Sequence, residues 1–186
     1  ATKLTMNASD TIAALIVDGA RQEAGTYGRI GLAGVDYQVS WMKSTGNGIL
    51  TVLGVPSLYW DLNDTASGAC VSGDTAAGTW GAAGTWNAVS DGTGSTAAWT
   101  PGQTAIFAAG SDATGTYTVT VDGTQDIGGL KFAQGNVTLS DGALRMTSDS
   151  LARVVSGSTA TIATTIADDG TARQLSKGGD GTLVLS

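Results

Sequence analysis

Short runs of alternating hydrophobic and polar residues recur along the chain and are separated by turns that contain Gly or Asp. In residues 116–121, Tyr117, Val119 and Val121 are spaced two apart, and residues 35–41 alternate in the same way. A period of two places every second side chain on one face of a β-strand. The pattern therefore predicts short strands that each bury one face.

From residue 104 onward these runs are about five residues long and return at intervals of roughly ten residues. Regular short strands of this kind indicate a β-solenoid, a sandwich or a barrel. The fold class that we predict is all-β, as a parallel β-helix or solenoid, with an antiparallel β-sandwich as the alternative. Helix content should be low, because charged residues make up only 13% and Glu23 is the single glutamate, whereas exposed helix positions favour Glu and Lys.

The segment 175–186 combines a glycine turn with a strand. Lys177 precedes a G-x-G turn, and the strand that follows places Leu183 and Leu185 on its buried face. Residues 43–54 form a looser copy, in which a lysine again precedes a G-x-G turn and a strand. The chain therefore contains an imperfect internal repeat.

A strand at the edge of a sheet has unpaired backbone groups, which must be covered, tolerated or paired with another chain. We predict that the terminal strand mediates self-association, and that pairing end to end would build a filament. The alternative is that Ser186 is merely where this sequence stops within a longer run of repeats. The residues expected at the contact are Leu175, Thr182, Leu183, Val184 and Leu185.

The middle of the chain differs in composition from the rest. We divide the sequence into an N-terminal β segment (1–55), a Trp- and Gly-rich irregular segment (56–103) and a strand-repeat segment (104–186), which could also form one continuous domain. Four of the five tryptophans lie in the middle segment, at Trp60, Trp80, Trp86 and Trp99. We expect these rings to anchor the segment by burial against a strand surface. The alternative is that Trp80 and Trp86 stack against sugar rings.

The terminal pattern resembles a known motif. Residues Leu175, Lys177, Gly179, Gly181, Thr182, Leu183 and Leu185 fit L-x-K-x-G-x-G-T-L-x-L, which is similar to the autotransporter-associated β-strand repeat. The segment from Trp60 to Phe107 resembles the region that often leads into such repeats. This resemblance implies a parallel β-helix on the outer surface of a bacterium, with a structural or adhesive role.

Charge excludes several classes of partner. The net charge is −7 with a pI near 4.2, and the nine basic residues are scattered, which argues against nucleic acid and against an anionic membrane surface. No apolar run approaches the roughly 18 residues of a membrane span, so we expect no membrane insertion. Low charge with abundant Thr and Gly suits an extracellular or cell-surface protein. The single cysteine, Cys70, has no partner for an internal disulfide.

Candidate chemistry is sparse. The chain has no histidine, the commonest general base and metal ligand. Many aspartates lie beside Gly or in turns, where Asp commonly bonds its own backbone. The acidic residues at 61–64 and 168–169 do not follow the calcium-binding nonapeptide. We therefore expect no enzyme activity, cofactor or metal, and predict a structural surface protein that pairs with copies or repeats of its own kind. Two alternatives are an adhesin-like module that binds surface polysaccharide and a polysaccharide-acting enzyme that uses paired carboxylates.

Overall fold

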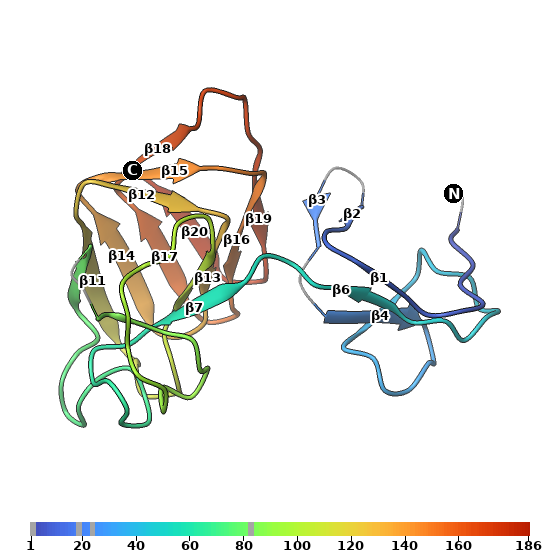
Figure 1. The fold of residues 1–186 in the computed structure, drawn as a ribbon, viewed down its shortest axis with the longest axis horizontal. Coiled ribbons are helices and arrows are strands. Elements are labelled where there is room, and N and C mark those ends of the chain that lie inside the picture. Colours follow the sequence, from blue (N-terminus) through green and yellow to red (C-terminus); the bar gives the residue numbers. More distant parts are fainter. Residues whose placement is uncertain (1–2, 18–19, 23–24, 82–83) are drawn as a thin grey trace. The chain divides into compact units, whose positions relative to one another are not determined.

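The computed structural model describes residues 3–17, 20–22, 25–81 and 84–186. It divides into two compact units, Ala1–Pro56 and Ser57–Ser186 (Figure 1). Every regular element is a strand, and the described residues form no helix. The Trp- and Gly-rich segment, apart from residue 56, belongs to the same unit as the later strands. The prediction of an all-β fold is confirmed.

The larger unit is a parallel β-solenoid of about four turns. The prediction of a solenoid is therefore confirmed, and the unit is not an antiparallel sandwich. Three sheets run along it, which we call sheets I, II and III. Sheet I contains β7 (Ser57–Trp60), β10 (Thr104–Phe107), β13 (Gly129–Phe132), β16 (Ser150–Val154) and β19 (Leu175–Gly178). Sheet II contains β8 (Gly78–Trp80), β11 (Thr116–Val121), β14 (Asn136–Ser140), β17 (Thr159–Ile162) and β20 (Thr182–Leu185). Sheet III contains β12 (Thr124–Ile127), β15 (Ala143–Met146) and β18 (Thr165–Asp168).

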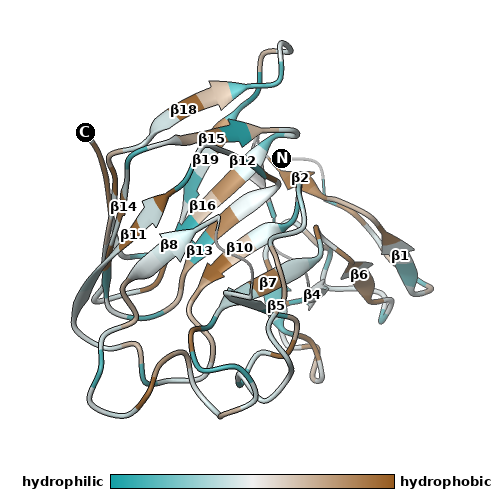
Figure 2. Ribbon diagram, turned by 60° about the vertical axis from the view of Figure 1, so that its left-hand side comes forward, coloured by the Kyte–Doolittle hydropathy of each residue, from teal (hydrophilic) through white to brown (hydrophobic). Residues whose placement is uncertain are grey.

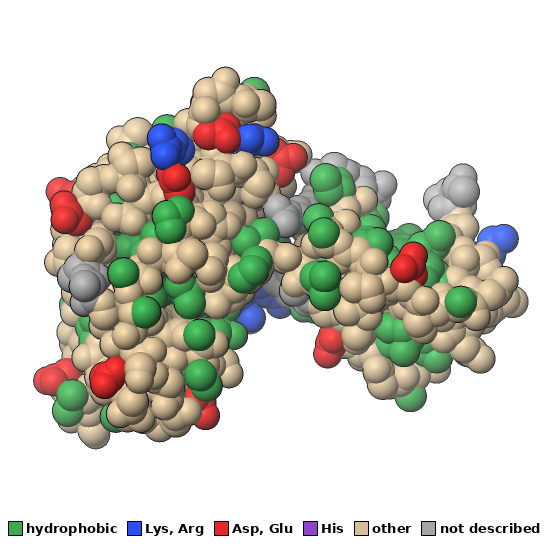
Figure 3. All heavy atoms as spheres, in the orientation of Figure 1, with side chains coloured by type: hydrophobic (Ala, Val, Ile, Leu, Met, Phe, Trp, Pro, Cys, Tyr) green, Lys and Arg blue, Asp and Glu red, His purple; other side chains and the backbone are tan. Residues whose placement is uncertain are grey.

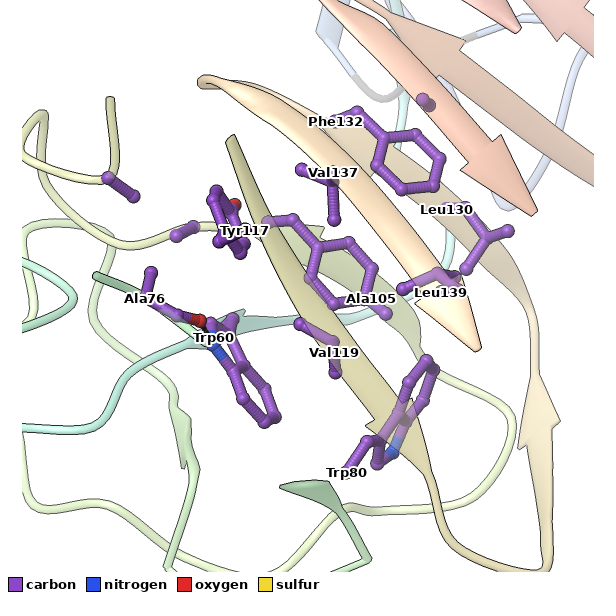
Figure 4. Close-up of a cluster of buried hydrophobic side chains, with 14 of the residues drawn as sticks. Trp60, Ala76, Trp80, Ala105, Tyr117, Val119, Leu130, Phe132, Val137 and Leu139 are labelled. Carbon is purple, nitrogen blue, oxygen red and sulfur yellow. Dashed lines mark hydrogen bonds between the residues drawn. The ribbon is translucent and has the colours of Figure 1, made fainter. Parts of the chain in front are cut away.

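The core of the solenoid consists of side chains stacked in register from coil to coil. In sheet II, Val119 pairs with Leu139 and Leu139 with Ile162, and all three are buried. In sheet I, Phe107 lies over Phe132 with ring centroids 5.3 Å apart. Figure 2 shows hydrophobic and polar positions alternating along the strands, and Figure 4 shows the buried side chains meeting inside. The period of two in the sequence therefore forms continuous apolar ladders. Burying each large side chain in them stabilises the fold by about 1.5 to 3 kcal/mol.

The Trp-rich segment closes one end of the solenoid. Strand β9 (Trp86–Asn87) pairs antiparallel with β7 and covers the outer edge of sheet I. Trp60, Trp80 and Trp86 are fully buried, and the ring centroids of Trp80 and Trp86 are 4.9 Å apart. Large rings fill the space under the first coil, as expected for a solenoid cap. The tryptophans therefore anchor this segment as the sequence analysis anticipated.

The smaller unit is a four-stranded sheet with a short hairpin. The sheet has the order β1 (Asp10–Ile12), β6 (Leu50–Val52), β4 (Gly25–Arg29) and β5 (Tyr37–Val39). Among the described residues, its core contains the buried side chains of Tyr27, Met42, Leu50 and Val52. The hairpin joins β2 (Ile16–Val17) to β3 (Ala20–Arg21).

The two sequence copies with the G-x-G turn form the same kind of stacked corner. Gly46 and Gly179 have φ angles of 92° and 71°, which favour glycine. A Cβ atom at Gly46 would collide with the carbonyl oxygen of Met6, and one at Gly179 with that of Val154. The strands that follow, β6 and β20, each pair in parallel with an earlier strand. Glycine therefore lets each corner rest directly on the backbone of the preceding segment.

Candidate functional site

The residues predicted for self-association lie on the last strands of sheets I and II. Leu175 begins β19, and residues 182–185 are β20. Strand β20 pairs with β17 on one side and is the outermost strand of its sheet. Among the residues that the structure describes, no strand covers its other side. This edge is the candidate site.

The inward side chains of β20 extend the apolar ladders of sheet II. Leu183 follows Ala160 in register, and Leu185 follows Ile162. Leu183 is partly buried against the core, whereas Leu185 is 58% exposed because no described strand lies beyond it. Val184 points to the opposite face and is 38% exposed. The edge therefore presents an apolar strip that another strand would bury.

The backbone of β20 also has unused hydrogen-bonding capacity. The amides of Thr182 and Ser186 donate to the carbonyl oxygens of Ser158 and Ile162, at 3.0 and 3.1 Å. In a parallel pair alternate residues turn both backbone groups toward the partner strand. The N–H and C=O groups of Leu183 and Leu185 therefore point to the open side, where an added strand could pair with them.

The last strands of sheets I and III differ from β20, because in each of them one apolar ladder ends at a charged residue. In sheet I the ladder through Leu130 and Ala152 ends at Lys177. In sheet III the ladder through Met146 ends at Asp168. Charges at inward positions are one of the ways by which proteins protect a sheet edge from pairing. Of the three last strands described, β20 has no charged residue at an inward position, although Ile166 in β18 also continues an apolar ladder, that of Leu144.

Both charges make local hydrogen bonds. The Lys177 ammonium donates to the carbonyl oxygen of Gly179 at 2.8 Å, and the Asp168 carboxylate accepts from the Gly170 amide at 3.0 Å. Next to Asp168, Asp169 forms an ion pair of 2.8 Å with Arg173. The hydrogen bonds from Arg173 lower the pKa of Asp169. On the face shown in Figure 3, charged side chains are scattered and Lys and Arg form no large patch.

At the capped end, a buried polar pair holds the Trp-rich segment in place. The Asn87 side-chain amide donates to the Asp61 carboxylate at 2.7 Å and to the carbonyl oxygen of Gly92 at 3.0 Å. Both side chains are fully buried, and burial raises the pKa of Asp61. Asp61 is one of the residues considered for calcium, but its carboxylate binds an amide of the cap. No pattern in the sequence marks Asn87 for this role, although its position next to Trp86 places it in the same segment.

The sugar-stacking alternative at Trp80 and Trp86 does not fit the structure. Both side chains are fully buried, and they pack edge to face with each other. A platform for a sugar needs an exposed ring face, which neither residue has. These two tryptophans are core residues of the cap.

The described acidic and thiol groups outside these regions give no further site. Within the described ranges, no group of three or more His, Cys, Asp or Glu residues could hold a metal ion. The thiol of Cys70 is buried and lies 3.6 Å from the carbonyl oxygen of Asp74, and burial raises its pKa. Among the described residues, no helix is long and apolar enough to span a membrane.

Comparison with known proteins found no matching family model, no curated protein and no solved structure with significant similarity to this chain. The resemblance to the autotransporter-associated β-strand repeat therefore stays a prediction from the sequence motifs. What the structure adds is the solenoid itself and the contrast between its two ends.

Proposed function

We propose that this chain is a structural β-solenoid protein that associates with further copies of itself through the β20 edge. The observation that carries the proposal is the apolar ladder that ends at Leu185. The Leu185 side chain is 58% exposed, and backbone donors and acceptors of its strand point away from β17. Adding one strand there would bury the apolar strip and pair the backbone in one step. The ends of a solenoid are its least satisfied parts, so association at an end is favoured over contact along its sides.

The location that we propose is the cell surface or the extracellular space, as a building block of a larger assembly. The acidic balance and the low content of charged residues support this setting. The L-x-K-x-G-x-G-T-L-x-L pattern, which resembles a repeat of bacterial surface proteins, also supports it. An end-to-end contact produces a filament when two different surfaces meet, and a closed pair when one surface meets itself.

The experiment that tests self-association is sedimentation velocity of the 186-residue chain over a wide range of concentrations. We expect a reversible increase in sedimentation coefficient with concentration. Replacing Leu185 by Asp should abolish it, because a buried carboxylate without a partner is strongly unfavourable. Leu53 is a matched control, since it is 62% exposed and belongs to the other compact unit.

Leu53→Asp should leave the association unchanged, and both variants should keep the circular dichroism spectrum of the parent. A chain that stays monomeric at every concentration would refute the proposal. Equal loss of association in both variants would show that the β20 edge is not the contact.

A further inference from the structure

We infer that the outer face of sheet II binds the surface of ice through a regular array of threonine side chains. This face is the broad side of the sheet, so the inference depends neither on where β20 ends nor on the proposed self-association. It follows from the residue type at the outward positions, from the register of the strands and from the lack of charge along them.

Threonine occupies most of the outward positions of sheet II. In β11, the buried Tyr117, Val119 and Val121 alternate with three threonines on the opposite face. The same alternation continues through β14 and β17, whose inward residues are also buried. The threonines on this face, all exposed or partly exposed, are Thr79, Thr116, Thr118, Thr120, Thr138, Thr159, Thr161 and Thr182. The face is therefore rich in hydroxyl and methyl groups.

The parallel register aligns these side chains in columns that run from coil to coil. Thr118 pairs with Thr138, and Thr138 pairs with Thr161. In the next column, Thr159 pairs with Thr182. Figure 1 shows the strands β11, β14, β17 and β20 side by side. Neighbouring strands lie about 4.8 Å apart, and every second residue along a parallel strand recurs after about 6.6 Å, so the threonines form a two-dimensional array with two repeat distances.

The hydroxyl groups of this array are available to an external partner. Within the described chain none of them makes a hydrogen bond, and at Thr159 it is the backbone amide that donates to the Asn136 side chain, at 2.8 Å. Threonine is branched at Cβ, which restricts χ1, and the buried ladders beneath the face hold the backbone in place. The array therefore loses little side-chain freedom on binding, and preorganised surfaces bind more tightly for this reason.

Sheet II also differs from the other two sheets in its lack of charge. Its strands β8, β11, β14, β17 and β20 contain only uncharged residues. By contrast, Lys131 and Arg153 are register neighbours on the outer face of sheet I, and Asp126 and Arg145 form an ion pair of 2.6 Å on sheet III. Because removing a charge from water is unfavourable, the uncharged face is the one that a neutral surface can best cover.

A partner that matches this face must be neutral and must repeat with the same two distances. Ice meets both conditions, because its surface water molecules donate and accept hydrogen bonds and the repeats of its oxygen lattice lie close to both distances. Threonine supplies a hydroxyl group for these bonds and a methyl group that packs against the lattice between them. The array in sheet II therefore has the chemistry and the spacing that adsorption to ice requires.

Crystalline polysaccharide is the other neutral and periodic surface to consider. Proteins commonly bind sugar rings by stacking them on exposed aromatic side chains, whereas sheet II turns Trp80 and Tyr117 into the core. Its described outer face therefore has no ring on which a sugar could stack, and ice is the better match.

Partitioning into slowly grown ice tests the inference with the 186-residue chain. The parent should be enriched in the ice fraction, whereas a protein without affinity for ice stays in the liquid, and the parent should also shape a single ice crystal and delay its growth below the melting point. Thr138→Tyr, in the middle of the array, should lose both effects, because the larger side chain lifts the neighbouring threonines off the ice surface. Thr165→Tyr is the matched control, since Thr165 is exposed on β18 of sheet III, and it should behave like the parent.

Both variants should keep the circular dichroism spectrum of the parent. Exclusion of the parent from ice, or equal loss in the two variants, would overturn the inference. Binding of the parent to crystalline cellulose or chitin that Thr138→Tyr abolishes, without enrichment in ice, would also overturn it and would identify the face as a polysaccharide site. Self-association is measured separately by sedimentation velocity, and Thr138→Tyr should retain it because Leu185 is unchanged.

Discussion

At the scale of single residues, Asn87 is a buried polar side chain that links parts of the solenoid cap. Its amide is buried and donates to Asp61 and to Gly92. Asn87→Ala leaves a buried carboxylate without its side-chain donor, and we expect the larger unit to lose about 2 to 4 kcal/mol of stability. Asn136 is the control, since it is exposed and accepts from the Thr159 amide at 2.8 Å. Urea unfolding should show a clearly larger loss for Asn87→Ala than for Asn136→Ala.

A second residue-scale prediction concerns pH. Arg145 binds Asp126 through two hydrogen bonds of 2.6 and 2.9 Å, and these lower the pKa of Asp126. A lowered carboxylate pKa in the folded state stabilises the protein above the unfolded value of 3.8, and this stabilisation is lost as the pH falls through the folded pKa. Because the Arg145 side chain is 48% exposed, solvent screens the ion pair and the gain in stability is small.

The stability difference between the parent and Arg145→Ala should therefore be present at neutral pH and vanish on acidification. Chemical denaturation across this pH range measures it, with Lys131→Ala as a control for loss of a positive charge. A difference that stays constant down to the acid limit would show that the ion pair is not its source.

At the scale of elements, the G-x-G corner separates two reasons for glycine. Gly179 and Gly157 both have positive φ, but a Cβ at Gly179 would collide with the Val154 carbonyl oxygen, whereas one at Gly157 meets nothing within 4 Å. Gly157→Ala should cost about 1 to 2 kcal/mol from backbone strain alone. Gly179→Ala should cost more, because the corner must also lift off the coil below. Equal losses in thermal unfolding would contradict the close stacking of this corner.

The same elements show what could be read from the sequence and what could not. The alternation at Tyr117, Val119 and Val121 predicted an inward face, and all three side chains are buried, because a period of two is a local property of the backbone. That Lys177 and Asp168 end apolar ladders follows from the register in which residues of successive coils stack, and these coils differ in length. That register cannot be obtained from local spacing.

At the scale of the whole molecule, the two compact units have separate hydrophobic cores. Of the described residues, four form the smaller buried core, whereas the larger unit buries a continuous cluster that runs from Leu58 to Ile162. Small units bury a lower fraction of their surface and are correspondingly less stable. We therefore predict that the full chain unfolds in two steps, with the smaller unit first.

A fragment of residues 57–186 should fold alone and reproduce the second step, because its strands, its core and its cap all lie within that range. Since the β20 edge belongs to this fragment, it should also keep the self-association of the full chain. Denaturant unfolding monitored by tryptophan fluorescence reports mainly the larger unit, because four of the five tryptophans lie there, and far-ultraviolet circular dichroism reports both. Coincident single transitions from both probes would mean that the units unfold as one, and loss of association in the fragment would place part of the contact in residues 1–56.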